Sequence, residues 1–176
     1  MEKWNLREAT NADTALLASL AREIYREYYL HLWLDAGEWY QEAMYNEART
    51  GAELADPNNL FFIASLEDHP VAYLKLRKDA GLEEHKPSDC LELERIYIRK
   101  EASGQGLGRL LVSHTFSIAR SLGKRWVFLK AMDSSLDAIG FYERMGFVRC
   151  GELTLPYPQM KEIYRGMVIM KHELIT

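Results

Sequence analysis

Three glycines at alternate positions, Gly104, Gly106 and Gly108, stand where the pattern of the sequence changes. From residue 107 onward the apolar residues recur at helical spacing, so a helix is expected to begin here and to end near Gly123. Glycines let backbone N–H groups approach a ligand closely, and the start of a helix carries a partial positive charge. The spacing therefore predicts a turn that binds phosphate.

The nucleotide-binding motifs do not match this turn. The chain lacks Gly-x-x-x-x-Gly-Lys-Ser/Thr, and a dinucleotide motif would need its third glycine where Arg109 stands. A dinucleotide site would also need an acidic residue at a strand end about 20 residues further on. The strand expected near there, residues 125–129, is followed by Lys130 instead.

Two stretches resemble motifs of the GNAT superfamily of N-acetyltransferases. Residues 103–108 resemble the pyrophosphate-binding motif Gln/Arg-x-x-Gly-x-Gly/Ala, with Gly106 and Gly108 in place and Ser103 at the first position. Residues 135–147 resemble Asn-x-x-Ala-x-x-Phe-Tyr-x-x-x-Gly-Phe, with Ser135 where asparagine is usual. The two motifs occur in the family's order and at its spacing, which makes the pair more specific than either alone.

The resemblance implies acetyl-CoA as co-substrate and direct transfer of its acetyl group to a primary amine. It implies that a splayed strand at residues 96–98 holds the acetyl carbonyl and the pantetheine amides through its backbone. Tyr142 would protonate the departing thiolate; alternatively, it only packs against Phe141. Arg109 either adds a cation or is a solvated residue of the first helical turn. The residues expected to contact coenzyme A are Ile96, Tyr97, Ile98, Ser103, Gly104, Gln105, Gly106, Leu107, Gly108, Arg109, Ser135, Phe141 and Arg144.

Glu92 and Glu94 are the candidate general bases. The alternation over residues 92–98 predicts that both carboxylates project from the same face as Ile96 and Ile98, toward the acetyl group. A carboxylate there could take a proton from the amine or attract it as a cation. Glu94 is preferred because it lies nearer to the acetyl end. The alternative is that each carboxylate only pairs with Arg95 or a helix end.

Residues 23–47 mix aromatic and acidic side chains densely. One interpretation is a helix over residues 35–49 whose rings are core and whose carboxylates are solvated; the other is a wall for a cationic amine. In GNAT folds this segment overlies the acceptor site. The motifs look most like the PaiA-type branch, which implies spermidine or spermine as acceptor. Two alternatives remain. One is acetylation of a protein N-terminus or lysine, and the other is coenzyme A binding without turnover.

The remaining patterns supply the elements that would position these residues. Periodicity and turn residues indicate strands over residues 4–8, 60–66, 71–77, 91–98, 125–130, 147–155 and 163–172. A first helix is expected after the caps at residues 10–13, with Leu16, Leu20, Ile24 and Tyr28 on its apolar face. Further helices are expected over residues 35–49 and 107–122, and in the stretch capped by Ser134 and Asp137 and ended by Gly146. The expectation is one α/β (α+β) domain over residues 1–176. It would have the GNAT fold, with a mixed, mostly antiparallel sheet flanked by helices in the order β-α-α-β-β-β-α-β-α-β-β.

Composition narrows the partners. A formal net charge of −4 over 176 residues gives no reason to expect nucleic acid as a partner, which would call for a basic patch. The charged first residues and the lack of a long apolar run predict no membrane association and a cytoplasmic location. No His or Cys spacing suggests a metal. The expected partner is a small-molecule amine, and a homodimer is left open.

Overall fold

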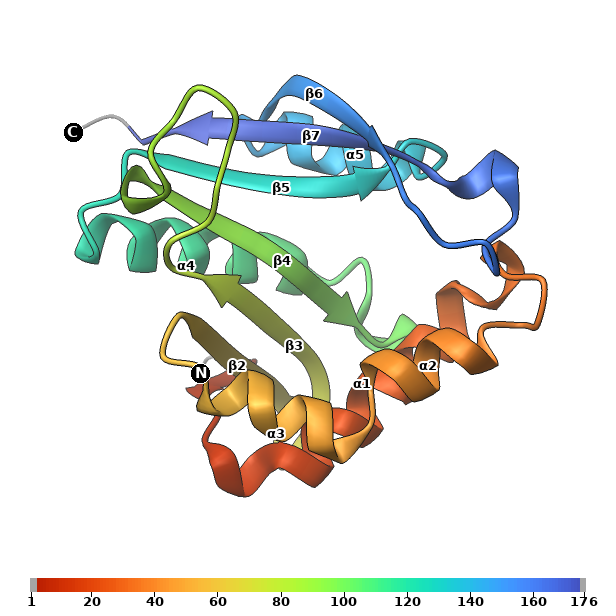
Figure 1. Cartoon of the computed structure of the whole chain (residues 1–176). Coiled ribbons are helices and arrows are strands. Elements are labelled where there is room, and N and C mark those ends of the chain that lie inside the picture. The colour runs from red at the N-terminus through yellow and green to blue at the C-terminus, as the bar shows by residue number, and fades with distance from the viewer. Residues whose placement is uncertain (1–2, 175–176) are drawn as a thin grey trace.

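The computed structural model describes residues 3–174 and contains a seven-stranded sheet (Figure 1). The strands are β1 (Asn5–Glu8), β2 (Asn59–Leu66), β3 (His69–Arg77), β4 (Cys90–Ile98), β5 (Trp126–Met132), β6 (Val148–Thr154) and β7 (Gly166–Glu173). The helices are α1 (Thr14–Tyr28), α2 (Glu38–Met44), α3 (Glu47–Ala55), α4 (Leu107–Ser121) and α5 (Leu136–Arg144). Short 3-10 turns lie between several of them.

The sheet has the strand order β1-β2-β3-β4-β5-β7-β6. All neighbouring strands are antiparallel except β4 and β5, which are parallel and connected through α4. This confirms the predicted mixed, mostly antiparallel sheet flanked by helices. The same architecture places the end of β4, the glycine turn and the start of α4 in one continuous segment.

The single helix expected over residues 35–49 is wrong, because two helices occupy this region. The backbone of Tyr45 leaves helical geometry at φ −122° and ψ 29°, which ends α2. Asn46 then caps α3, and its side chain accepts a hydrogen bond of 2.8 Å from the Arg49 N–H. The capping box expected between Ser134 and Asp137 is also absent: Ser135 is the N-cap of α5, without a side-chain cap.

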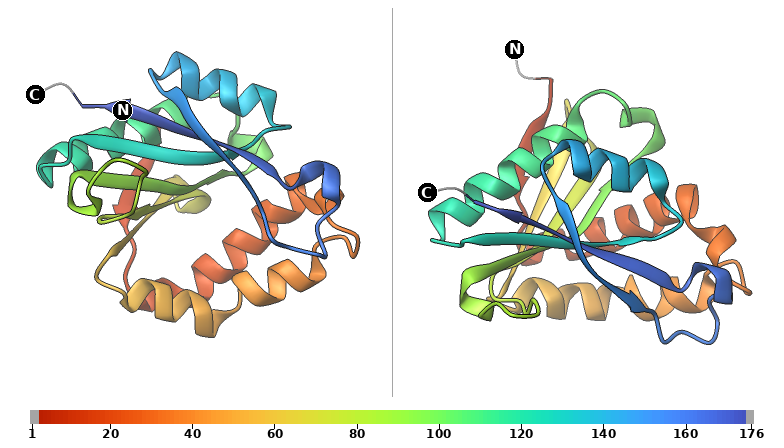
Figure 2. Two further views of the ribbon diagram at one scale, coloured as in Figure 1. Left: turned by 45° about the horizontal axis from the view of Figure 1, so that its top comes forward. Right: turned by 90° about the horizontal axis from the view of Figure 1, so that it is seen from above.

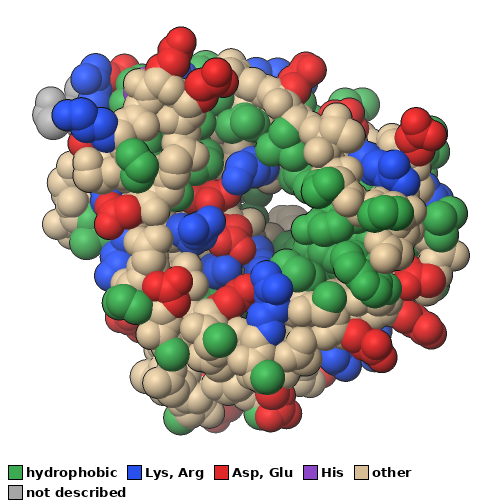
Figure 3. All heavy atoms as spheres, viewed as in Figure 1, with side chains coloured by type: hydrophobic (Ala, Val, Ile, Leu, Met, Phe, Trp, Pro, Cys, Tyr) green, Lys and Arg blue, Asp and Glu red, His purple; other side chains and the backbone are tan. Residues whose placement is uncertain are grey.

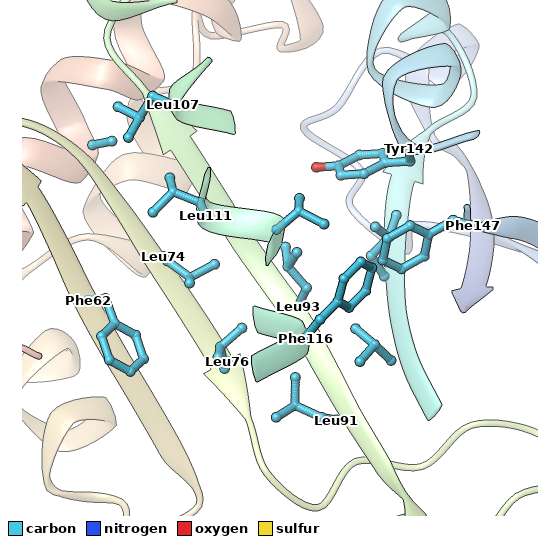
Figure 4. Packing of buried hydrophobic residues seen from close by; sticks show 14 of the residues in the cluster. Phe62, Leu74, Leu76, Leu91, Leu93, Leu107, Leu111, Phe116, Tyr142 and Phe147 are labelled. Carbon is cyan, nitrogen blue, oxygen red and sulfur yellow. The ribbon is translucent and has the colours of Figure 1, made fainter. Parts of the chain in front are cut away.

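Helices cover both faces of the sheet (Figure 2). Side chains of α4 and α5 pack with the strands into one apolar cluster, which Figure 4 shows around Leu111, Phe116 and Phe147. A second cluster on the other face joins α1 to β2, β3 and β4 through residues such as Ile24 and Ile63. The two faces therefore carry different side chains to the central strands.

β4 and β5 pair only along a short stretch. The parallel register joins Cys90–Glu92 to Trp126–Phe128, and beyond these residues the two strands separate (Figure 1). On its other edge β4 stays paired with β3 as far as Ile98, opposite Ala72. The β5-facing backbone of residues 96–98 is thus free of sheet pairing, as the predicted splayed strand requires.

Candidate active site

The glycine turn precedes α4 directly. Gly104 and Gly106 have φ values of +71° and +88°, and nothing lies within 4 Å of where their side chains would begin. The N–H of Leu110 donates to the Gly106 carbonyl at 3.1 Å. The three N–H groups before it, at residues 107–109, lie at the start of the helix, where the helix itself offers no acceptor. The turn therefore offers backbone donors and open space to an anion.

A groove of about 1240 Å³ lies beside this turn, between the start of α4, the end of β4 and α5. We call it the glycine-turn groove. Arg109 and Arg144 are the cations that border it. Eleven of the residues predicted for the site border it as well: Ile96, Ile98, Ser103, Gly104, Gly106, Gly108, Arg109, Ser135, Phe141, Tyr142 and Arg144.

Three predicted contacts do not border the groove through their side chains. Tyr97 lies on the opposite face of β4, where its hydroxyl is 3.0 Å from that of Tyr45. Leu107 is fully buried in the core under α4. The side chain of Gln105 donates to the Glu101 carbonyl at 2.6 Å. A role for these three residues would have to come from their backbone.

A second, smaller cavity of about 260 Å³ opens on the other side of β4. We call it the aromatic cavity, because its border includes Tyr25, Tyr29, Trp33, Tyr40 and Tyr157. Trp33 and Tyr40 stack at 4.7 Å between ring centroids, and the Trp33 indole N–H donates to the Tyr25 hydroxyl at 2.7 Å. The rings contact one another closely and form a largely apolar wall.

Tyr142 borders both cavities. Its ring packs against Phe141 and Phe147, and Figure 4 shows its hydroxyl directed away from Phe147. Burial, with a smaller contribution from Tyr29, raises the pKa of Tyr142 well above the ordinary value for tyrosine. The hydroxyl therefore stays protonated across the physiological range and can act as a proton donor where the two cavities meet.

Tyr29 also borders both cavities, and burial raises its pKa to about 12. The aromatic density of residues 23–47 pointed to this region, but not to Tyr29 in particular. Tyr157 and Lys130 were not predicted to line a site. Tyr157 lies in the loop between β6 and β7, and Lys130 lies on β5, so only the folded chain brings them to the rings of α1 and α2.

The carboxylates of residues 23–47 do not share this cavity. Glu23 and Glu27 bind the segment after β4: Glu23 pairs with Arg99, and Glu27 accepts the Lys100 N–H at 2.7 Å. Asp35 accepts the N–H groups of residues 37 and 39 at the start of α2. The remaining acids of the segment, Glu38, Glu42 and Glu47, are exposed. The wall that was expected to combine rings with carboxylates therefore contains rings and the apolar side chains of Leu32 and Met44, but no carboxylate of this segment.

The predicted common face of Glu92, Glu94 and Ile96 is also wrong. Leu76 pairs with Leu93 and Lys75 pairs with Arg95, so Glu94 is an extra residue in β4, a β-bulge. Residues 91, 93, 96 and 98 consequently all pack into the core cluster under α4. The bulge leaves Glu92 and Glu94 on the opposite face of the strand, with the side chain of Arg95.

On that face the two carboxylates join a network of ion pairs. Glu94 accepts from Lys75 at 2.8 Å and lies 3.4 Å from Arg95, and it borders the aromatic cavity. Glu92 is bound by Lys130 at 2.9 Å and borders neither cavity. Glu94 is thus the one of the two candidate bases that reaches a cavity.

Glu53 of α3 completes the network, since it contacts both Lys75 and Arg95 at 3.1 Å. Burial would raise its pKa, but Arg95 and Lys75 outweigh burial and lower it. Their attraction therefore stabilises the fold above the ordinary pKa of glutamate, and this contribution is lost as the pH falls through the lowered value.

We expect Glu53→Gln to lower the free energy of unfolding by about 2 kcal/mol at pH 7, because two buried cations lose a shared partner while Glu94 remains. Urea unfolding measures the loss, which should shrink in acid. Glu42→Gln on α2 is the matched control, since this carboxylate is exposed. Equal stability of the two variants at pH 7 would show that the network contributes no net stability.

Residues 3–174 show neither a cluster of metal ligands nor a membrane-spanning helix. No three His, Cys, Asp or Glu side chains there come together as a metal site would require. No helix in this range combines the length and the apolar character that crossing a bilayer needs.

Comparison with known proteins agrees with this geometry. The acetyltransferase (GNAT) family profile matches residues 18–147. An uncharacterized N-acetyltransferase of Lactobacillus delbrueckii subsp. lactis is 32% identical over 64% of this chain and 65% of its own length. The peptidyl-lysine N-acetyltransferase YjaB of Salmonella typhimurium is 29% identical over 56% of this chain and 59% of its own length. The matched region thus spans less than two thirds of these relatives.

A solved structure, the PaiA N-acetyltransferase of Thermoplasma acidophilum in complex with coenzyme A, superposes with a TM-score of 0.74. The superposition covers 99% of this chain and 100% of the PaiA chain at 19% sequence identity. The two proteins therefore share a fold. The family match extends across both motifs and the strands β2 to β5. The chain therefore belongs to the acetyltransferase (GNAT) family.

Proposed function

We propose that this protein is an N-acetyltransferase that transfers the acetyl group of acetyl-CoA to a primary amine. The observation that carries the proposal is the meeting of two cavities at Tyr142. One cavity offers donors for an anion, and the other is lined by rings and a few charged groups. A donor and an acceptor bound on opposite sides of β4 would meet beside one buried hydroxyl.

The residues of the glycine-turn groove fit coenzyme A. Backbone N–H groups at residues 107–109 and the Arg109 side chain would hold the pyrophosphate. The unpaired backbone of Ile96 and Ile98 would hold amide groups. The PaiA neighbour was solved with coenzyme A, which supports the same ligand here.

Acetyl-CoA supplies an acetyl thioester whose C–S bond breaks as a C–N bond to the amine forms, while the amine loses a proton and the thiolate gains one. Tyr142 would give the thiolate its proton. The β4 backbone would position the acetyl carbonyl. The tyrosines that border both cavities, Tyr29 and Tyr142, exclude water from the point of transfer.

Glu94 is the proposed acceptor of the amine proton, and Glu92 is held second because it does not reach a cavity. We expect Glu94→Gln to lower kcat by roughly tenfold if the carboxylate acts as a base. A change mainly in KM would instead assign Glu94 to attracting the ammonium form. Steady-state kinetics at saturating acetyl-CoA separates the two outcomes, and unaltered kinetics would exclude both roles.

Spermidine or spermine was the acceptor expected from the sequence. The faces of aromatic rings attract cations, so the rings of the aromatic cavity remain in favour of a cationic amine. The carboxylates of residues 23–47 lie elsewhere and Glu94 is the one acid that borders the cavity within the described residues, so the cavity lining gives a polycation little support. The second candidate acceptor is the N-terminal amine or a lysine side chain of a peptide or protein. The relative YjaB is named a peptidyl-lysine N-acetyltransferase.

The test is release of free thiol from acetyl-CoA in the presence of a panel of primary amines, with mass spectrometry of the product. The panel contains spermidine, amino acids and their amides, and peptides with a free N-terminus or lysine. An acetylated amine supports the proposal. Coenzyme A binding without any acetylated product would indicate a regulatory module instead.

We propose the cytoplasm as the location, because the reaction would consume acetyl-CoA.

A further inference from the structure

The aromatic cavity has two unlike sides. Figure 3 shows Lys, Arg, Asp and Glu side chains along one side of the opening and hydrophobic side chains along the other. Glu94 and Arg95 of β4 and Lys130 of β5 are the charged residues that border it. An acceptor that fills the cavity would therefore touch a charged side and an apolar side together.

The charged side carries an excess of positive charge. Five cations and three carboxylates form one chain of ion pairs within 4 Å, which leaves two positive charges unbalanced. Each carboxylate already lies close to at least two cations, which weakens its attraction for a further cationic ligand. The cations are Arg49, Lys75, Arg77, Arg95 and Lys130, and the carboxylates are Glu53, Glu92 and Glu94.

Among the three members of this network that border the cavity, Lys130 is the one placed to bind a ligand. Its side chain is 38% exposed, against 9% for Arg95 and 23% for Glu94. Its only ion pair within the described residues is with Glu92, which Arg77 also approaches. An ammonium group has three N–H donors, so Lys130 can bind a second anion without giving up Glu92.

The apolar side suits a ring or a branched chain. Trp33 and Tyr25 are almost completely buried, and they border the cavity together with Tyr40. Aromatic pairs prefer offset or tilted contacts, and the wall already contains both stacked and tilted pairs. A ligand with an aromatic or large apolar side chain would extend this packing and displace water from it.

We propose that the acceptor is an amino acid with an aromatic or large apolar side chain, its carboxylate on Lys130 and its side chain against the rings. This inference rests on the proposed acetyltransferase function and names its substrate class. The amine would then lie between the carboxylate and the side chain, in the cavity that Tyr142 borders. Spermidine, which has no anionic group, would meet the positive excess instead.

The first experiment measures binding without turnover. Isothermal calorimetry on the protein saturated with coenzyme A compares phenylalanine, tryptophan and leucine with their carboxamides and with spermidine. Each amide keeps the amine and the side chain but removes the charge. We expect the acids to bind at least about tenfold more tightly than their amides, the scale of one hydrogen bond to a charged group. Equal affinity, or tighter binding of spermidine, would overturn the inference.

The second experiment uses a variant. Lys130→Met keeps most of the length of the side chain and removes its charge, and it should abolish the preference for acid over amide. Lys130→Arg should retain the preference. Lys86→Met is the matched control, because Lys86 is exposed and borders neither cavity. Unchanged calorimetric affinity for coenzyme A establishes that each variant is folded. A preference that survives in Lys130→Met would remove Lys130 from recognition and overturn the assignment.

The two proposals fail separately. Thiol release with spermidine or an amide, but not with any amino acid, would leave the acetyltransferase function standing and overturn the amino-acid acceptor. Tight binding of an amino acid that depends on Lys130, without thiol release from acetyl-CoA, would support the recognition and overturn the transfer. Acetylation of the acid with a higher kcat/KM than its amide supports both.

Discussion

Gly106→Asp is expected to weaken coenzyme A binding by at least about 100-fold. The new carboxylate would stand at the N-cap of α4, beside the donors proposed for the pyrophosphate, where a second negative charge repels the ligand and also competes for the N–H groups. Nothing within 4 Å of this position forces the fold to move. Isothermal calorimetry with coenzyme A measures the effect on the folded variant.

Backbone strain could also affect the Gly106→Asp variant, because φ is +88° at this position and aspartate adopts this left-handed region only at a modest cost in free energy. Gly123→Asp is the matched control. It lies beyond the other end of α4 with φ +67° and equally open surroundings, so it shares the backbone strain and the added charge. Loss of binding in Gly106→Asp alone locates the pyrophosphate. Equal affinities in the two variants would place the ligand elsewhere.

The glycine turn and the sheet could be predicted because their signals are local. Alternate glycines before a helical pattern, and a second motif at the right distance, are read directly from neighbouring residues. The predicted splay of β4 is confirmed as well, since pairing with β5 ends at Glu92. That expectation came from the family resemblance, because alternation alone does not reveal where two strands part.

The side chains of the acceptor region could not be assigned in the same way. A single bulge at Glu94 reverses the faces of β4, and it depends on how Lys75 and Leu76 align across the sheet. No pattern within residues 91–98 marks it. The prediction that the acids of residues 23–47 line the acceptor site was wrong for a similar reason. Arg99 and the start of α2 bind several of these carboxylates, and solvent surrounds the others.

The same distinction explains why Lys130 was not predicted to line the cavity. In the sequence, Lys130 served only as evidence against a dinucleotide site, because it is a cation where that site needs an acid. In the fold it lies across the splayed strands from Glu94 and borders the same cavity. Positions of this kind, set by the meeting of separate segments, are where substrate choice within a shared fold can vary.

Tyr142→Phe is expected to lower kcat by roughly 10–100-fold while coenzyme A affinity stays nearly unchanged. The substitution keeps the ring against Phe141 and Phe147 and removes only the hydroxyl that would protonate the thiolate. Because burial raises the pKa of Tyr142 above its ordinary value of 10.0, the phenol keeps its proton as the solution approaches pH 10. Loss of the Tyr142 proton should therefore not lower the wild-type rate up to that pH.

Tyr73→Phe provides the comparison for loss of a buried hydroxyl, because Tyr73 is fully buried and borders neither cavity. Both variants lose one oxygen from the core, so a general effect on packing would lower the two rates alike. A loss of kcat confined to Tyr142→Phe, with the affinity for coenzyme A retained by calorimetry, assigns the proton to this hydroxyl. A full rate in Tyr142→Phe would leave Tyr142 as a packing residue between the two cavities and make solvent the source of the proton.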